Sequence, residues 1–240
     1  MVKVSVITAT YNAMQHLPAL AESLRGQTDK DFEWVVADGA STDGTLEYLK
    51  SITDLNVKVI SQEDFGIYDA LNRGVKAASG EFYIVAGADD VLYPNAIGTF
   101  KSAICDDAGI ITANIDVGNA IAKPKAGRAW LYGMGAIVSG HAVGSCIRRS
   151  LHEKFGYYSR SFPICADQLF IGRLYRNGVP VKAVDTVVGR FELQGLSSMD
   201  VLGMITEFYR VQVRLGFNKY LQTLLVVLRL LKNIKNIHNV

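Results

Sequence analysis

The first half of the chain alternates short apolar runs with amphipathic segments, and this alternation constrains the fold more than any other feature. The apolar runs are rich in β-branched residues or bounded by glycine, as buried strands are. They lie at residues 2–8, 32–37, 57–60 and 82–86, with helical spacing at 13–27, 46–52 and 67–78. The pattern predicts an α/β fold with a mostly parallel central sheet, helices on both faces and right-handed crossovers.

Polar residues follow each predicted strand, at 8–12, Asp38, 62–64 and the pair Asp89-Asp90. Because the carboxyl ends of parallel strands meet at one edge of a sheet, we expect a crevice of nucleotide size there. The chain has no Gly-x-Gly-x-x-Gly after the first strand and no Gly-Lys-Ser/Thr loop. A standard dinucleotide fold and a P-loop are therefore not indicated.

The adjacent acids Asp89 and Asp90 allow two interpretations. Two neighbouring carboxylates in a crevice repel each other, so they fit best around a cation, and hard oxygen ligands favour Mg²⁺ or Mn²⁺. Alternatively, Asp90 caps a helix that begins at Pro94, since Asp is a good N-cap and Pro a good first-turn residue. This stretch alone leaves both open.

Composition narrows the classes of protein. The 240 residues are 49% hydrophobic and 20% charged with a net charge of +2, which excludes a disordered chain and gives no argument for a nucleic-acid partner. The cysteines Cys105, Cys146 and Cys165 form no Cys-x-x-Cys pattern, so we expect reduced thiols. The sequence shows neither signal-peptide features nor an apolar run of the ~18 residues that a membrane span needs. We therefore predict a cytoplasmic location.

Five motifs in the first hundred residues occur together in one enzyme family. They are Ser5-Val-Ile-Thr-Ala-Thr-Tyr-Asn12, Asp38-Gly-Ala-Ser-Thr-Asp-Gly-Thr45, Asp64-Phe-Gly-Ile-Tyr-Asp-Ala-Leu-Asn-Arg-Gly74, Ala78-Ser-Gly-Glu81 and Gly87-Ala-Asp-Asp90. In this order they resemble family 2 glycosyltransferases of the GT-A fold, and residues 66–74 are most similar to the bacterial polysaccharide and exopolysaccharide branch. Many relatives carry a further Asp at the position of Gly87.

The resemblance implies roles for these residues. Tyr11 and Asp38 are expected at the nucleotide base, Asp89 at the ribose or sugar, and Asp90 at an Mn²⁺ or Mg²⁺ ion that bridges the donor diphosphate. The full set implied for nucleotide-sugar binding is Thr10, Tyr11, Asp38, Asp64, Asn72 and Asp89, with Asp90 and Asp89 at the metal.

The second half offers fewer candidates. His141 and Arg148 stand at the two ends of a short apolar segment and are possible accessory residues, although a structural role for the histidine is equally open. Asp167 lies in the first turn of a predicted helix, where an acid can simply compensate the helix dipole. The family resemblance instead implies that Asp167 is the general base. Residues 191–198 resemble a turn near the donor, with Gln194 in place of a glycine.

Together these features imply an inverting, metal-dependent transfer of a sugar from a nucleotide-diphosphate donor to a saccharide or lipid-linked saccharide. A sugar nucleotidyltransferase is a rival class, but it would be expected to carry a Gly-rich basic loop at residues 8–14, which are neither. A non-catalytic scaffold is a second rival. We expect a catalytic domain at 1–198, with a nucleotide-sugar-binding half at 1–115 and an acceptor half at 116–198.

Residues 199–240 are predicted to be helical and amphipathic. Tyr220, Leu224, Val227, Leu231 and Ile234 share one face, and Gln222, Arg229, Asn233 and Asn236 lie opposite. No acid follows Glu207, whereas several Lys and Arg residues do. A basic amphipathic helix indicates peripheral contact with the inner face of the membrane, or packing on a partner subunit such as a second copy in a homodimer. The alternative is a helix whose apolar face covers its own core.

Overall fold

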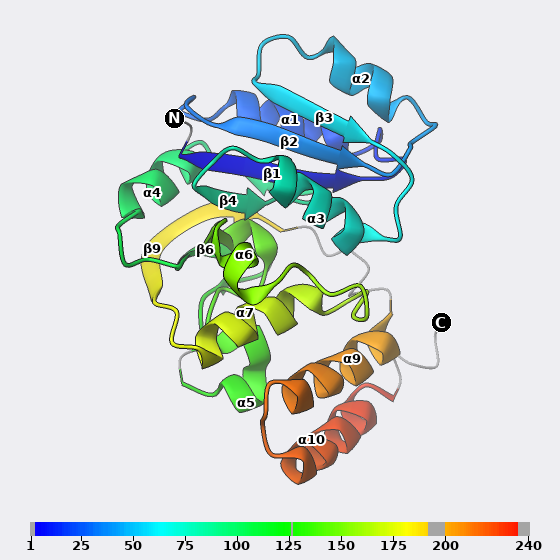
Figure 1. Cartoon of the computed structure of the whole chain (residues 1–240), viewed down its shortest axis with the longest axis vertical. Coiled ribbons are helices and arrows are strands. Elements are labelled where there is room, and N and C mark those ends of the chain that lie inside the picture. The colour runs from blue at the N-terminus through cyan, green and yellow to red at the C-terminus, as the bar shows by residue number, and fades with distance from the viewer. Residues whose placement is uncertain (1–2, 126, 192–199, 235–240) are drawn as a thin grey trace.

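The computed structural model describes residues 3–125, 127–191 and 200–234. Its centre is one sheet in the order β3-β2-β1-β4-β8-β6-β9-β5, with β7 paired to β6 (Figure 1). The first four strands are all parallel, as the sequence predicted. Their bounds are β1 Val4–Thr10, β2 Glu33–Asp38, β3 Val57–Ser61 and β4 Phe82–Val85.

The second half of the chain makes the sheet mixed. β8 runs antiparallel to β4 and to β6, β6 is parallel to β9, and the short β5 is antiparallel to β9. These strands are β5 Val91–Leu92, β6 Ile110–Asp116, β7 Ile121–Ala122, β8 Ser145–Arg148 and β9 Val181–Arg190. The α/β fold is thus confirmed, and its antiparallel pairs lie in the second half of the chain, where the periodic pattern is weakest. The boundary proposed at residue 115 falls inside β6.

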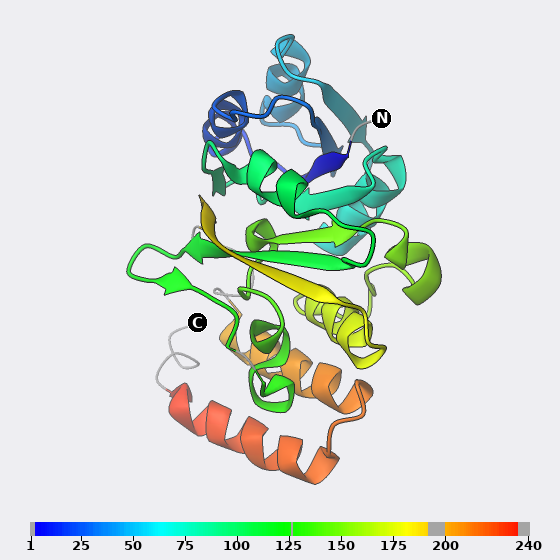
Figure 2. The same ribbon diagram turned by 90° about the vertical axis from the view of Figure 1, so that its left-hand side faces the viewer.

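Helices cover both faces of the sheet (Figure 2). One face carries α1 Leu17–Arg25, α2 Thr45–Ser51 and α4 Ala96–Ala103. The other carries α3 Ile67–Ala77 and α7 Ala166–Arg176. Short helical turns complete the second half, namely α5 Ala129–Tyr132, η1 Gly133–Ala136, η2 Ala142–Gly144 and α6 Leu151–Phe155.

The alternation of side chains along the strands explains the two layers. In β2, Trp34 and Val36 pack into the core under α1, and Val35 between them packs into the core under α3. Both neighbours of Val35 are fully buried, because a central strand has helices on each side. The Trp34 indole Nε1 donates to the Thr8 hydroxyl at 3.0 Å, which satisfies the buried polar group.

A buried carboxylate joins three segments at the opposite end of the sheet from the predicted crevice. Glu33 Oε1 accepts hydrogen bonds from the Ser5 hydroxyl, from the backbone N–H and hydroxyl of Ser79, and from the Gly80 N–H. Burial by itself would raise the pKa of Glu33, but these donors outweigh burial and lower it. Glu33 therefore stays charged and ties β1 and β2 to the turn before β4.

Two helices follow the sheet, α9 Val201–Arg214 and α10 Lys219–Lys232. Asp200 caps α9 by accepting from the Gly203 N–H, and Asn218 caps α10 by accepting from the N–H groups of Tyr220 and Leu221. Both views place α10 alongside α9, at the end of the molecule opposite α2 (Figures 1 and 2). The predicted helical tail is observed over these ranges; residues 199 and 235–240 lie outside the described part. Within it, no helix has the length and apolar character to cross a bilayer.

Gly74 should be a packing requirement of the fold. A Cβ added there would lie 2.4 Å from Ile7 Cγ2, because α3 rests directly on β1. We expect Gly74→Ala to lower the free energy of unfolding by about 1–3 kcal/mol through overpacking, measured by urea denaturation.

Gly98→Ala in α4 is the matched control. The nearest atom to its added Cβ is Asp29 Cβ at 3.8 Å, an ordinary contact. Alanine has the higher helix propensity, so this variant should keep or slightly raise stability. Equal losses in the two variants would contradict the close approach of α3 to β1.

Candidate functional site

A cleft of about 370 Å³ opens at the carboxyl end of β4. Its walls come from the start of α3, the segment after β4, residues 140–142, the start of α7 and α9. Its polar lining includes Tyr68, Asp89, Asp90, His141, Asp167 and Gln168. The fold therefore brings four of the predicted site residues, from both halves of the chain, to one cavity large enough for a small-molecule ligand.

The acid pair lies on the β4 side of the cleft. Asp90 is almost fully buried, and its Oδ2 accepts a hydrogen bond from the Gly87 N–H at 2.7 Å. The helix after it begins at Ala96 with Asn95 as its N-cap. The capping interpretation of Asp90 is therefore wrong, because the chain first passes through β5 and a turn.

Gly87 is explained by the space beside the acids. A Cβ at this position would lie 2.7 Å from Asp89 Oδ1 and 3.1 Å from Asp90 Oδ2. A side chain here would crowd both carboxylates in their present positions. Many relatives carry an Asp at this position. Here the backbone of Gly87 lies so close to Asp89 and Asp90 that a side chain would crowd them.

Asp167 faces the same cleft from α7. Its Oδ1 accepts from the Tyr68 hydroxyl at 2.8 Å and from the Gln168 N–H at 2.7 Å. The Tyr68 hydroxyl also lies 2.9 Å from the Ile164 carbonyl oxygen, so its single proton is shared between two acceptors. Burial raises the pKa of Asp167 above its usual value, and the Tyr68 hydrogen bond acts in the opposite direction.

His141 lies in the wall of the same cleft. Its ring packs on Phe191 with the ring centroids 4.0 Å apart. Burial lowers the pKa of His141, so the imidazole is neutral at pH 7. A neutral imidazole has one donor and one acceptor nitrogen, and it can therefore hydrogen-bond a hydroxyl group.

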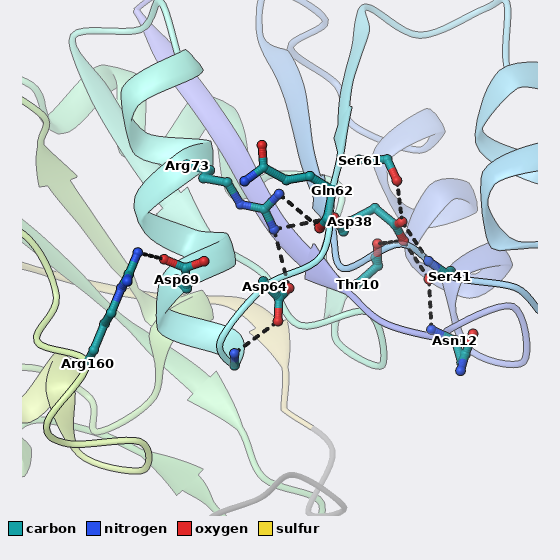
Figure 3. Close-up of polar contacts among 11 residues, drawn as sticks. Thr10, Asn12, Asp38, Ser41, Ser61, Gln62, Asp64, Asp69, Arg73 and Arg160 are labelled. Atoms are coloured by element: carbon teal, nitrogen blue, oxygen red, sulfur yellow. Dashed lines mark hydrogen bonds and ion pairs between the residues drawn. The ribbon is translucent and has the colours of Figure 1, made fainter.

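Asp38 organises the ends of β1 and β2 beside the cleft (Figure 3). Its two oxygens accept four hydrogen bonds, from the Thr10 hydroxyl, the Ser41 N–H and hydroxyl, and the Ser61 hydroxyl. Asp38 is fully buried, and Tyr11 next to this cluster is 70% exposed. Asp38 thus holds the loop after β2 to the ends of β1 and β3, and the Tyr11 ring is exposed beside it.

Sequence analysis missed Arg73, a cation at this edge of the sheet. Its guanidinium lies 3.3 Å from Asp64 Oδ2 and donates to the backbone carbonyls of Asp38 and Gln62 (Figure 3). Asp64 also accepts from the Gly66 N–H, which fixes the start of α3. Arg73 occurs in the third motif, one residue after Asn72, and its charge was the signal that could have identified it. Tyr68, in the same motif, was missed as the partner of Asp167.

Like Thr10, Tyr11, Asp38 and Asp64, two further predicted residues lie outside the cleft lining. Asn72 donates to the Tyr158 carbonyl and accepts from the Tyr158 N–H, both at 2.9 Å, so it braces α3 against the opposite wall. Arg148 pairs with Phe82 at the amino end of β4, where it binds Glu81 and the carbonyls of Cys105, Asp106 and Ala108. The accessory role expected of Arg148 is wrong, since the antiparallel β8 carries it to the far end of the sheet from His141.

Asp89 and Asp90 can supply part of the ligand set of a cation, but not all of it. Across the described ranges, no three His, Cys, Asp or Glu side chains gather closely enough to hold a metal by themselves. Asp89 and Asp90 are adjacent hard-oxygen donors on an open cleft, which suits Mg²⁺ or Mn²⁺ bound jointly with ligand phosphates.

Of the turn expected at 191–198, only Phe191 is described, and Gln194 lies outside the described residues.

Solved structures share this architecture. S. aureus TarS in complex with UDP-GlcNAc matches with a TM-score of 0.74 at 21% identity, over 97% of this chain and 73% of that one. The mannosyltransferase PcManGT from Pyrobaculum calidifontis, in complex with GDP-Man and Mn²⁺, matches with a TM-score of 0.70 at 16% identity, over 97% and 75%. The chain therefore has the GT-A glycosyltransferase fold.

The sequence comparisons give the family. The profile described as glycosyl transferase family 2 matches residues 5–161, and the chain belongs to that family. A curated relative is the PGL/p-HBAD biosynthesis glycosyltransferase of Mycobacterium bovis, 44% identical over 92 residues. That segment is 37% of this chain and only 36% of the relative.

The Asp38 cluster should contribute to stability in a pH-dependent way. Burial would raise the pKa of Asp38, but its hydrogen bonds outweigh burial and lower it. The contribution is therefore present above the unfolded-state value of about 3.9 and is lost as pH falls through the folded-state value. Asp38→Asn should lower the free energy of unfolding at pH 7 by about 1–3 kcal/mol.

Urea denaturation at several pH values checks this, with the exposed Asp107→Asn as control. The difference between wild type and Asp38→Asn should shrink below about pH 4, because the wild-type carboxyl then becomes protonated. A difference that stays constant with pH would argue against a charged Asp38 in the cluster.

Proposed function

We propose that this chain is an inverting, metal-dependent glycosyltransferase of bacterial surface polysaccharide synthesis. It moves a sugar from a nucleotide-diphosphate donor to a saccharide or lipid-linked saccharide acceptor. The observation that carries the proposal is that Asp89 and Asp90 line the same cleft as Asp167, which projects from the opposite half of the chain. Acids separated in this way can serve two roles: one group stabilises the leaving group, and the other accepts the proton of the nucleophile.

The donor is assigned to the side of the cleft formed by the ends of β1, β2 and β4. Tyr11, Asp38 and Asp64 lie toward the nucleotide, and Asp89 lies toward the ribose or sugar. Asp90, with Asp89, would hold Mn²⁺ or Mg²⁺ at the diphosphate, where a cation neutralises charge that develops on the leaving nucleoside diphosphate. The neighbours solved with UDP-GlcNAc and with GDP-Man and Mn²⁺ support this assignment.

Asp167 is the proposed base. The proton of the acceptor hydroxyl passes to Asp167, the acceptor oxygen bonds to the anomeric carbon, and the bond from that carbon to the diphosphate oxygen breaks. Attack opposite the leaving group inverts the anomeric centre. Both observed hydrogen bonds to the carboxylate go to Oδ1, so we assign Oδ2 to the acceptor proton. Burial favours the protonated form and makes Asp167 a better base than an exposed Asp.

Two further points support the proposal. His141, neutral and in the cleft wall, is placed to hydrogen-bond a sugar hydroxyl. Cys105, Cys146 and Cys165 are free thiols, which suits the reducing cytoplasm as the place of reaction. The family match favours glycosyl transfer over nucleotidyl transfer.

Asp90→Asn and Asp167→Asn form a matched pair that separates donor binding from catalysis. With Mn²⁺ and UDP or GDP at about 100 Kd, the wild type should melt about 5–10 °C higher than without ligand. Asp90→Asn should lose the part of this shift that depends on Mn²⁺, and Asp167→Asn should keep it. Asp167→Asn should instead reduce transfer from a panel of UDP- and GDP-sugars about 10²- to 10⁴-fold, measured as released nucleoside diphosphate.

Three results would contradict parts of the proposal. An undiminished rate in Asp167→Asn removes this residue as the base, and a full Mn²⁺-dependent shift in Asp90→Asn removes the metal assignment. A wild type that neither UDP nor GDP stabilises, with or without Mn²⁺, would favour the non-catalytic scaffold.

Tyr68→Phe tests the hydrogen bond by which Tyr68 on α3 contacts Asp167 on α7. The Tyr68 hydrogen bond lowers the pKa of Asp167, so its loss should raise that pKa. Because a base must be deprotonated to act, the acidic limb of the kcat profile should move to higher pH. Tyr175→Phe changes an exposed tyrosine on α7, the helix that carries Asp167, and should leave the limb in place. An unmoved limb in Tyr68→Phe would exclude this coupling.

A further inference from the structure

α10 lies on the protein with its apolar side outward. Six apolar side chains, here called the apolar stripe, follow one face of the helix and are all exposed: Tyr220, Leu224, Val227, Leu228, Leu231 and Ile234. Leu224 is 57% exposed and Leu231 is 61% exposed. The alternative that the apolar face covers the protein's own core is therefore wrong.

The polar face of α10 packs inward and holds the helix in this orientation. Gln222 is fully buried and its Nε2 donates to the Trp130 carbonyl at 2.7 Å. The Arg229 guanidinium donates to the Leu131 carbonyl at 2.8 Å and lies 4.4 Å from the centre of the Phe208 ring. Turning the apolar stripe inward would break these hydrogen bonds and the cation–π contact, and it would leave the Trp130 and Leu131 carbonyls beneath the helix without their donors.

The charges beside the stripe identify its partner. At about 100° per residue, Lys219 and Lys232 fall on opposite edges of the stripe, and both are exposed. Arg214 at the end of α9 is exposed as well, and no acid follows Glu207 in the sequence. An apolar strip with cationic edges complements a surface of anionic lipid head groups over acyl chains.

A second copy of the chain fits this surface poorly. Pairing two such stripes in an antiparallel dimer would put Lys219 of one copy and Lys232 of the other at each end of the interface, and no carboxylate on the helix would offset these charges. Spanning the bilayer is also excluded for α10, whose 14 residues reach only about 21 Å against a hydrocarbon core of about 30 Å.

We propose that α10 is an interfacial helix that docks the protein on an anionic membrane. The apolar stripe enters the boundary between head groups and acyl chains, and Lys219 and Lys232 bind lipid phosphates on either side. Gln222 and Arg229 fasten the helix to the α5 carbonyls, so the whole protein docks as one body. The inference is independent of the transfer chemistry proposed above.

Flotation with lipid vesicles tests the proposal on the full chain. The wild type should float with vesicles of phosphatidylcholine and phosphatidylglycerol, and less with pure phosphatidylcholine or at high salt. Leu224→Glu with Leu231→Glu should weaken binding at least tenfold, because two leucines lose their burial in lipid. Lys219→Glu with Lys232→Glu should abolish the preference for phosphatidylglycerol.

Ile121→Glu on β7 is the matched control, since Ile121 is also exposed and apolar but lies away from α10. It should float as the wild type does, and all variants should keep the wild-type melting temperature within a few degrees. A wild type that does not float, or a leucine double variant that floats equally well, overturns the proposal. A lipid-free dimer that the leucine double variant converts to monomer, seen by sedimentation velocity, would assign the stripe to a second copy instead.

Discussion

The position of β1 between two parallel neighbours is the constraint on which the site depends. β1 pairs with β2 on one side and β4 on the other, with Thr10 beside Asp38 and Ile7 beside Val85. All three strands therefore end at the same edge of the sheet. This register brings the Asp38 cluster next to the turn that carries Asp89 and Asp90, although about fifty residues separate them in the chain.

The second wall of the cleft depends on contacts between the two halves. α3 belongs to the first half, yet Tyr68 binds Asp167 and Asn72 binds the backbone of Tyr158. These hydrogen bonds hold α7 and the segment before it against α3. The candidate base thereby lines the same cleft as the acid pair, and α3, whose Arg73 pairs with Asp64, contacts both halves of the chain.

The two ends of the molecule use polar residues in a similar way. Asp38 and Glu33 are buried carboxylates whose hydrogen bonds join strands, and the buried Gln222 and half-buried Arg229 join α10 to α5. In each case a buried polar group must meet specific partners, so it selects one arrangement among several that would bury similar apolar area. At α10 this selection leaves the apolar face exposed.

The sequence alone determined the parallel half of the sheet, the order of its helices and the family, because apolar periodicity and strand-end motifs are local patterns. It also identified Asp89, Asp90, Asp167 and His141, which the fold brings to one cleft. Only the tertiary structure decided that Asp90 is no helix cap, that Arg148 lies at the far end of β4 and that Tyr68 and Arg73 contact the candidate acids. It also decided which face of α10 is exposed. These depend on strand direction and on pairings between distant residues, and a helical wheel gives the two faces of a helix without saying which one meets the protein.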